Sequence, residues 1–96
     1  MKIKHNENAH KGSFFIEEEG NSIILAELTY SFAGADKMIL DRTIISEALK
    51  DTGTERLLLD AAISYSRIKN IKVVPLCQSA KALIDNNPEY RKILLT

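Results

Sequence analysis

The hydrophobic pattern of this chain changes from the period of strands to that of a helix at the stretch KDTGTE, residues 50–55. On its N-terminal side, apolar residues alternate with polar ones as in strands, most clearly at Ile24, Ala26, Leu28, Tyr30 and Phe32. On its C-terminal side, apolar residues recur at helical spacing, at Leu58, Ala61, Ala62, Tyr65 and Ile68. We therefore expect strands to lead into an amphipathic helix, with KDTGTE at the junction.

Turn signals divide the rest of the chain into an order of elements. We expect turns at Gly20-Asn21 and at Gly34-Ala35-Asp36, between strands at residues 3–5, 13–19, 22–32 and 38–45. The helix ends at Asn70, and a strand at 71–75 and a helix at 77–87, stopped by Asn87-Pro88, follow it. An antiparallel meander leading into a βαβ unit predicts an α/β fold with a mixed sheet, a helix across one face and a C-terminal helix.

Length and composition exclude several classes of protein. A chain of 96 residues forms one domain, residues 1–96. A net charge of zero and only three Tyr, three Phe and no Trp argue against a nucleic-acid partner. No apolar run approaches the ~20 residues of a membrane span, and His5, His10 and Cys77 match no metal-ligand spacing. We therefore expect no membrane contact and no metal, and we expect a cytoplasmic protein because the N-terminus has no signal-peptide core.

The stretch KDTGTE has two interpretations. In the first, backbone amides of the turn and of the following helix wrap an anion, with Lys50 and Arg56 adding positive charge. In the second, Thr52 is the N-cap and Glu55 reaches back to its amide, which is a capping box. The two compete for the same amides, and on these residues alone the capping box is favoured.

Cys77 is the one residue whose type and place indicate chemistry. It falls at the start of the second expected helix, where the helix dipole lowers a thiol pKa, so it could act as a nucleophile or as a proton donor and acceptor. The alternative is a buried, inert cysteine, since free cysteine is among the most buried residue types. No histidine has an obvious route to it, so a Cys-His pair has no support.

Three stretches together resemble a known group of proteins. They are DRTIISEALKDTGTERLLLDAAISYSR, the strand IKVVPLC with its helix QSAKALIDN, and the ending NPEYRKIL. They are similar to the small single-domain proteins of the GNAT acetyltransferase superfamily, and within it to the YjdJ-like subfamily. The resemblance covers about Ile16 to Leu94 and implies a compact GNAT-like fold that binds acetyl-CoA as a co-substrate.

The resemblance also implies where the cofactor binds. The pyrophosphate would lie on the turn and first helical residue, namely Lys50, Asp51, Thr52, Gly53, Thr54, Glu55 and Arg56. The pantetheine arm would pair with the backbone of the preceding strand, at Thr43, Ile44 and Ile45. Cys77 matches a cysteine that members of the subfamily carry near the acetyl group, which makes it the candidate catalytic residue.

Two departures from the family pattern leave the function open between two alternatives. Arg42 stands where the subfamily has a histidine, and Glu55 stands where the turn has its second glycine. The resemblance implies an N-acetyltransferase that transfers acetyl to an unidentified amine, such as an exposed amine on a protein or a polyamine. The alternative is a non-catalytic CoA-binding or protein-interaction module with a degenerate cofactor turn.

Overall fold

The structure is a computed structural model that describes residues 2–20, 22–88 and 90. Five strands form one sheet in the order β1-β2-β3-β4-β5, antiparallel except for the parallel pair β4 and β5. The elements are β1 (Lys4–Glu7), β2 (Lys11–Glu17), β3 (Ile24–Ala33), β4 (Lys37–Ile45), the short 3-10 helix η1 (Glu47–Leu49), α1 (Thr54–Lys69), β5 (Lys72–Pro75) and α2 (Gln78–Asn86).

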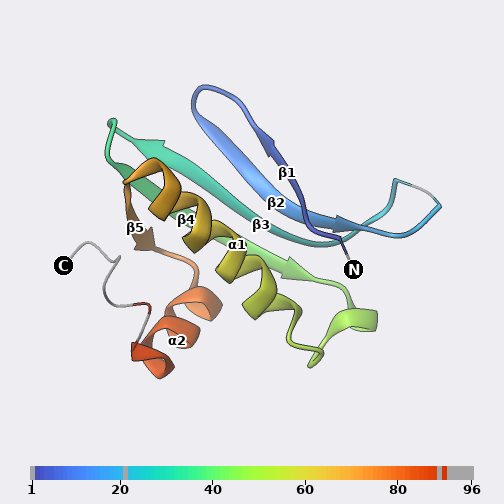
Figure 1. The fold of residues 1–96 in the computed structure, drawn as a ribbon. Coiled ribbons are helices and arrows are strands. Elements are labelled where there is room, and N and C mark those ends of the chain that lie inside the picture. The colour runs from blue at the N-terminus through green and yellow to red at the C-terminus, as the bar shows by residue number, and fades with distance from the viewer. Residues whose placement is uncertain (1, 21, 89, 91–96) are drawn as a thin grey trace.

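The predicted α/β fold with a mixed sheet is confirmed. Figure 1 shows α1 lying across one face of the sheet and α2 beside it, at the edge formed by β4 and β5. The predicted turn at Gly34-Ala35-Asp36 is present, whereas Asn21 of the other predicted turn lies outside the described residues. So do Glu89 and residues 91–94 of the NPEYRKIL stretch. The helix η1 was not predicted.

The core lies between the sheet and α1, and one predicted core residue is wrong. The buried stripe of α1 runs along Leu58, Leu59, Ala62, Ile63 and Ser66, whereas Ile68 is 81% exposed. With 3.6 residues per turn, Ile68 stands about 120° around the helix from Ala62, which is too far to face the sheet. The sheet contributes the buried Phe14, Ile16, Ala26, Leu28, Tyr30, Met38, Leu40 and Val73.

A bulge in β4 reverses which side chains face the helices. Thr29 pairs with Arg42 but Tyr30 pairs with Leu40, so Asp41 is an extra residue in the β4 strand. Strict alternation along the strand would place Arg42 on the same face as Met38 and Leu40. Because of the bulge, Arg42 is instead exposed on the face of the sheet away from the helices, while Met38 and Leu40 remain fully buried.

Candidate functional site

The strands β4 and β5 separate halfway along β4. Their pairing runs from Lys37↔Lys72 to Leu40↔Pro75, and then the amides of Leu76 and Cys77 both donate to the carbonyl oxygen of Leu40 at 3.1 Å. β4 continues through Ile45. In the described part of the chain, residues 41–45 therefore have no strand partner on the β5 side. The separation leaves an edge of extended backbone that a ligand can pair with.

The start of α1 differs from the predicted capping box, which is wrong. The N-cap is Gly53, in the left-handed region with φ 81°, and within the described part of the chain no side chain caps the helix. The Thr52 hydroxyl donates instead to the carbonyl oxygen of Leu49 at 2.5 Å and lies 2.6 Å from the Thr54 hydroxyl. The Thr52 hydroxyl is thus bonded to η1 and not to the helix. Neither Thr52 nor Glu55 accepts a hydrogen bond from the amides of the first turn of α1.

A pocket of about 300 Å3 lies between this turn, the end of β4 and α2. Apolar side chains of Ile45, Leu49 and Leu83 form part of its wall, and the charges around it are mixed. Seven of the predicted cofactor residues line it, namely Ile45, Lys50, Asp51, Gly53, Thr54, Glu55 and Arg56. The structure therefore brings together most of the residues that the sequence proposed for the pyrophosphate.

Three of the predicted cofactor residues lie outside this pocket. Thr52 does not line it, because its side chain turns back to η1. The side chain of Ile44 is on the opposite face of the sheet, 50% exposed beside Ile24, so only its backbone could serve a ligand at the β4 edge. Thr43 lies next to Cys77 instead.

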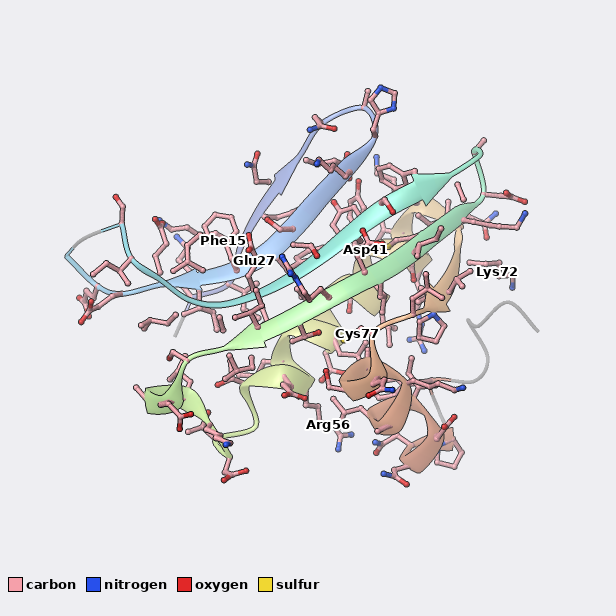
Figure 2. The ribbon with its side chains drawn as sticks, turned by 180° about the vertical axis from the view of Figure 1, so that it is seen from behind. Phe15, Glu27, Asp41, Arg56, Lys72 and Cys77 are labelled. Atoms are coloured by element: carbon pink, nitrogen blue, oxygen red, sulfur yellow. The ribbon has the colours of Figure 1, made fainter. Side chains whose placement is uncertain are left out.

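Cys77 is the N-cap residue of α2, beside the point where β4 and β5 separate (Figure 2). Its thiol is buried, and its sulfur lies 3.1 Å from the hydroxyl oxygen of Thr43 and 3.1 Å from that of Ser79. Burial raises the pKa of the thiol, but hydrogen bonds from Ser79 and Thr43, with the backbone amides of Ala80 and Ser79, bring the pKa below its ordinary value. This is an environment that favours thiolate.

Sequence reasoning missed Ser79 as a partner of Cys77. The signal was available, since Ser79 is two residues after the first residue of a predicted helix, and side chains there can reach back to the N-cap. Thr43 was predicted for its backbone, and its hydroxyl contact with the thiol was not foreseen. That contact joins residues 34 apart in the chain.

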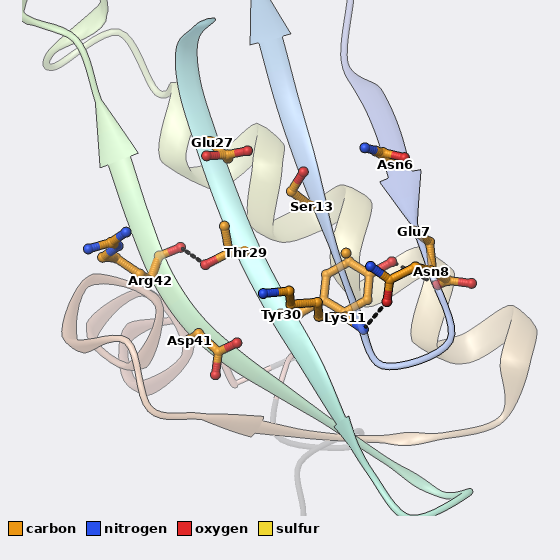
Figure 3. Close-up of a pocket in the computed structure, with 11 residues that line it drawn as sticks. Asn6, Glu7, Asn8, Lys11, Ser13, Glu27, Thr29, Tyr30, Asp41 and Arg42 are labelled. Atoms are coloured by element: carbon orange, nitrogen blue, oxygen red, sulfur yellow. Dashed lines mark hydrogen bonds between the residues drawn. The ribbon is translucent and has the colours of Figure 1, made fainter.

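A second hollow, of about 390 Å3, lies on the open face of the sheet (Figure 3). Figure 3 shows Glu27, Thr29 and Arg42 side by side there, with the Thr29 hydroxyl donating to the carbonyl oxygen of Arg42 at 3.3 Å. Asp41 accepts a hydrogen bond from the Ser31 hydroxyl at 3.2 Å. Arg42, which stands where the subfamily has a histidine, thus faces this polar hollow and not the pocket at the start of α1.

Residues 2–20, 22–88 and 90 hold neither a candidate metal site nor a candidate membrane span. No group of three or more His, Cys, Asp or Glu side chains in that part of the chain is arranged to hold a metal ion. No helix within it is both long and apolar enough to cross a membrane.

Comparison with protein families matches most of the sequence to a family model. The family model described as GCN5-related N-acetyl-transferase matches residues 13–93, which is most of the chain. No curated protein matches.

Comparison with solved structures agrees with that match. The solution structure of a GCN5-like protein from Staphylococcus aureus is 31% identical and superposes with a TM-score of 0.77, over 98% of this chain and 87% of that one. An aminoglycoside N-acetyltransferase solved with CoA is 15% identical, with a TM-score of 0.55 over 73% of this chain and 56% of that chain. Nourseothricin acetyltransferase is 12% identical, with a TM-score of 0.56 over 68% of this chain and 39% of that chain. The last two show a shared fold in much longer chains.

Proposed function

This chain belongs to the GCN5-related N-acetyltransferase family, and we propose that it binds acetyl-CoA and transfers the acetyl group to an amine. The observation that carries the proposal is the separation of β4 from β5, with Cys77 at the point of separation and an uncapped helix start at the far end. A buried thiol and a helix start without a side-chain cap lie at opposite ends of one backbone edge, and this arrangement supports the proposal of thiol chemistry at one end and anion binding at the other. Assignment to the YjdJ-like subfamily stays a prediction.

The β4 edge and the α1 turn would hold the two halves of the cofactor. Backbone groups of Thr43, Ile44 and Ile45 would pair with the amides of the pantetheine arm, as in strand addition. The pyrophosphate would lie on the turn of residues 50–56, where amides and the helix dipole favour negative charge by roughly 0.3 to 1 kcal/mol. The relative solved with CoA supports this use of the fold.

Glu55 works against the cofactor. It lines the same pocket as Lys50 and Arg56. A carboxylate about 4 Å from a phosphate charge would cost about 1 kcal/mol in water and about 4 kcal/mol at the effective dielectric of a protein surface. Glu55 makes no side-chain cap, so its side chain can rotate away without losing a capping hydrogen bond.

The proposed reaction transfers one acetyl group and balances without a further reagent. The neutral amine nitrogen attacks the thioester carbonyl carbon, a C–N bond forms, and the C–S bond breaks with its electron pair left on the CoA sulfur. Cys77 gives its thiol proton to that sulfur, and the newly formed N-protonated amide gives its extra proton to the Cys77 thiolate, which restores the thiol. The products are the acetylated amine and CoA thiol. Thr43 and Ser79 stabilise the intervening thiolate through their hydroxyls.

The acceptor we propose is an exposed amine, on a protein or a polyamine. This chain spans 56% of the length of the aminoglycoside enzyme and 39% of nourseothricin acetyltransferase, so the acceptors of those enzymes are not carried over to it. We propose the cytoplasm as the site of the reaction, since a single free cysteine suits a reducing compartment.

Calorimetric titration with acetyl-CoA and with desulfo-CoA, followed by a thiol-release assay, tests the proposal. Acetyl-CoA should bind, and adding spermidine or a lysine-containing peptide should release CoA thiol. Binding without release from any amine would favour the alternative, a CoA-binding module without catalysis. No binding of either ligand at millimolar concentration would exclude the cofactor site itself.

A further inference from the structure

Four polar side chains cross the open face of the sheet in one row, within the hollow of about 390 Å3. Asn6 of β1 pairs with Ser13 of β2, Ser13 pairs with Thr29 of β3, and Thr29 pairs with Arg42 of β4. We call these four residues the polar row, and Figure 3 shows them side by side from β1 to β4. Since neighbouring strands lie about 4.8 Å apart, the row spans roughly 14 Å.

The polar row ends beside the proposed reaction centre. Arg42, at its β4 end, precedes Thr43, whose hydroxyl oxygen lies 3.1 Å from the sulfur of Cys77. Figure 2 is seen from the open face, with the helices behind the sheet, and it shows Cys77 next to β4. A molecule that lies along the row therefore has one end at the edge where β4 and β5 separate.

The hollow also holds charges of both signs that no neighbour pairs. In the described part of the chain, no hydrogen bond or ion pair joins the side chain of Lys11, Glu27 or Arg42 to another residue. The other two charged groups that line the hollow, Glu7 and Asp41, already accept hydrogen bonds from hydroxyl groups. A ligand that carries both an acid and a base can therefore pair with side chains that are not yet engaged.

The donors and acceptors of the hollow specify the class of ligand further. The guanidinium of Arg42 only donates hydrogen bonds, and the carboxylate of Glu27 only accepts them. A protonated polyamine offers donors alone, so it would leave Arg42 without an acceptor. A peptide offers backbone carbonyl and amide groups to Asn6 and Ser13, whose side chains both donate and accept. About four extended residues match the length of the row.

We propose that the polar row binds a polypeptide segment that carries the acceptor lysine, with an acidic side chain of the segment on Arg42 and a basic one on Glu27. This inference rests on the proposed function and narrows its acceptor to a lysine of a peptide or protein. The lysine amine would reach the thioester past the β4 edge, next to Thr43 and Cys77. Arg42 acts here in acceptor binding and not in acid–base chemistry, because a guanidinium keeps its proton.

Acetylation of three end-blocked peptides tests the polar row. They are Gly-Glu-Lys-Arg-Gly, Gly-Gln-Lys-Arg-Gly and Gly-Glu-Lys-Gln-Gly, in which the lysine side chain is the only amine. Arg42→Gln should raise the KM of the two peptides with Glu about threefold to fivefold, as for the loss of an exposed ion pair, and leave the third within about twofold. Glu27→Gln should do the same to the two peptides with Arg and spare the third.

Lys72→Gln is the matched control, since Lys72 is an exposed charge on β5 that does not line the hollow. It should leave the KM of all three peptides within about twofold. An equal change for all three peptides in Arg42→Gln or Glu27→Gln would overturn the inference and leave the proposed function standing. Acetylation of spermidine with a higher kcat/KM than that of any peptide would do the same.

Binding without turnover separates this inference from the proposed function. If no amine is acetylated, the proposed function fails, and titration of 15N-labelled protein with Gly-Glu-Lys-Arg-Gly still tests the polar row. Shifts of the backbone amides of Asn6, Ser13, Thr29 and Arg42 would retain it as a peptide-binding site. No shift there at millimolar peptide would overturn it.

Discussion

The two ends of the sheet use their polar groups in opposite ways. At the N-terminal hairpin, His5, Glu7, Phe14, Tyr30 and Tyr65 form what we call the hairpin cluster. Within it the Tyr65 and Tyr30 hydroxyls donate to Oε1 of Glu7 at 2.5 and 2.8 Å, and His5 stacks on Phe14 with ring centroids 4.1 Å apart. The ring nitrogen of His5 also bonds to the Tyr30 hydroxyl.

The carboxyl end of β4 has the reverse arrangement. There β5 leaves β4 at Leu40, α1 begins without a side-chain cap, and the Cys77 thiol is held by two hydroxyls. Polar groups at the hairpin bond to one another, whereas backbone groups at the β4 end are open to a ligand. We infer that the hairpin cluster stabilises the fold and the β4 end binds and reacts. Mutations at the two ends should then differ in which quantity they change.

Substitution of Gly12 has the largest expected effect, and the effect is on the free energy of unfolding. A Cβ atom there would lie 2.5 Å from the Tyr30 hydroxyl oxygen and 2.5 Å from the Asn6 carbonyl oxygen. Tyr30 is fully buried, so Gly12→Ala should reduce the free energy of unfolding by about 3 kcal/mol. Urea denaturation at pH 7 measures it.

Gly53 provides the matched control at the other end. Apart from its two chain neighbours, no heavy atom of the described residues lies within 4 Å of a Cβ built there. The residue has φ 81°, so Gly53→Ala should cost only about 1 kcal/mol of unfolding free energy. A larger loss at Gly53 than at Gly12 would break the comparison between the two ends.

Substitution of Cys77 has the next largest expected effect, and the effect is on the rate of acetyl transfer. Cys77→Ala should lower kcat about 100-fold, as expected when a proton donor is lost, and leave the Kd of acetyl-CoA within about twofold. Steady-state kinetics and calorimetry measure the two quantities. An unchanged kcat would remove Cys77 from the chemistry.

Thr43→Val sharpens the same point without removing the thiol. Since the Thr43 hydroxyl helps lower the pKa of Cys77, this variant should raise that pKa and move the thiol-dependent limb of the pH–rate profile to higher pH. If this limb of the pH–rate profile does not move in Thr43→Val, it reports the ionisation of a group other than Cys77.

Tyr65 tests the hairpin cluster with a smaller change. Tyr65→Phe removes a hydrogen bond to Glu7 and should reduce the free energy of unfolding at pH 7 by about 1 to 1.5 kcal/mol. Glu27→Gln, on the open face of the sheet, should change it by less than about 0.5 kcal/mol. Acetyl-CoA affinity should be the same in both variants, and a loss of affinity in Tyr65→Phe would contradict the division of roles.

Tyr65→Phe should also alter how the free energy of unfolding depends on pH. The hydrogen bond from Tyr65, followed by that from Tyr30, holds the pKa of Glu7 below its ordinary value, although burial acts against them. The ionised form is favoured in the fold, so this stability is present above the unfolded pKa, about 4.3, and is lost as pH falls through the folded pKa. Tyr65→Phe should show a shallower acid loss. At high pH the group that titrates is Tyr65 itself, since burial raises its pKa to about 12. The stability that comes from its protonated hydroxyl is lost as the pH rises through that value.

Glu55 has the smallest expected effect, and its sign is the informative part. Glu55→Gln removes a negative charge from the pocket and should tighten acetyl-CoA binding about fivefold, equivalent to about 1 kcal/mol. Glu47→Gln makes the same chemical change in η1, outside the pocket, and should leave the Kd within about twofold. Weaker binding in Glu55→Gln would mean that Glu55 assists the ligand.

Most of the fold could be predicted because periodicity reports which faces are buried. The alternation in β3 and the helical spacing in α1 gave the element types, and Asn70, in the left-handed region at φ 57°, ends α1 as expected. The bulge at Asp41 could not be predicted, because no single residue type marks it and the register of β3 against β4 decides it. That one residue moved Arg42 to the opposite face.

The candidate site was predictable in position and less so in detail. Turn residues of KDTGTE do line a pocket, but sequence alone gave Thr52 as the helix cap, since Thr is a better N-cap than Gly on average. The contact that decides against it is with Leu49 of η1, a helix too short for a periodic signal. The hydrogen bond from the Tyr90 hydroxyl to Asp60 joins residues that are 30 apart in the chain, and no local pattern reports such a contact.

Backbone amide shifts during an acetyl-CoA titration of 15N-labelled protein test the central claim most directly. The account predicts shifts at residues 51–56, at residues 43–45 and at Cys77, with the hairpin cluster unchanged. Shifts confined to the hairpin cluster, or none at either end at millimolar acetyl-CoA, would contradict it.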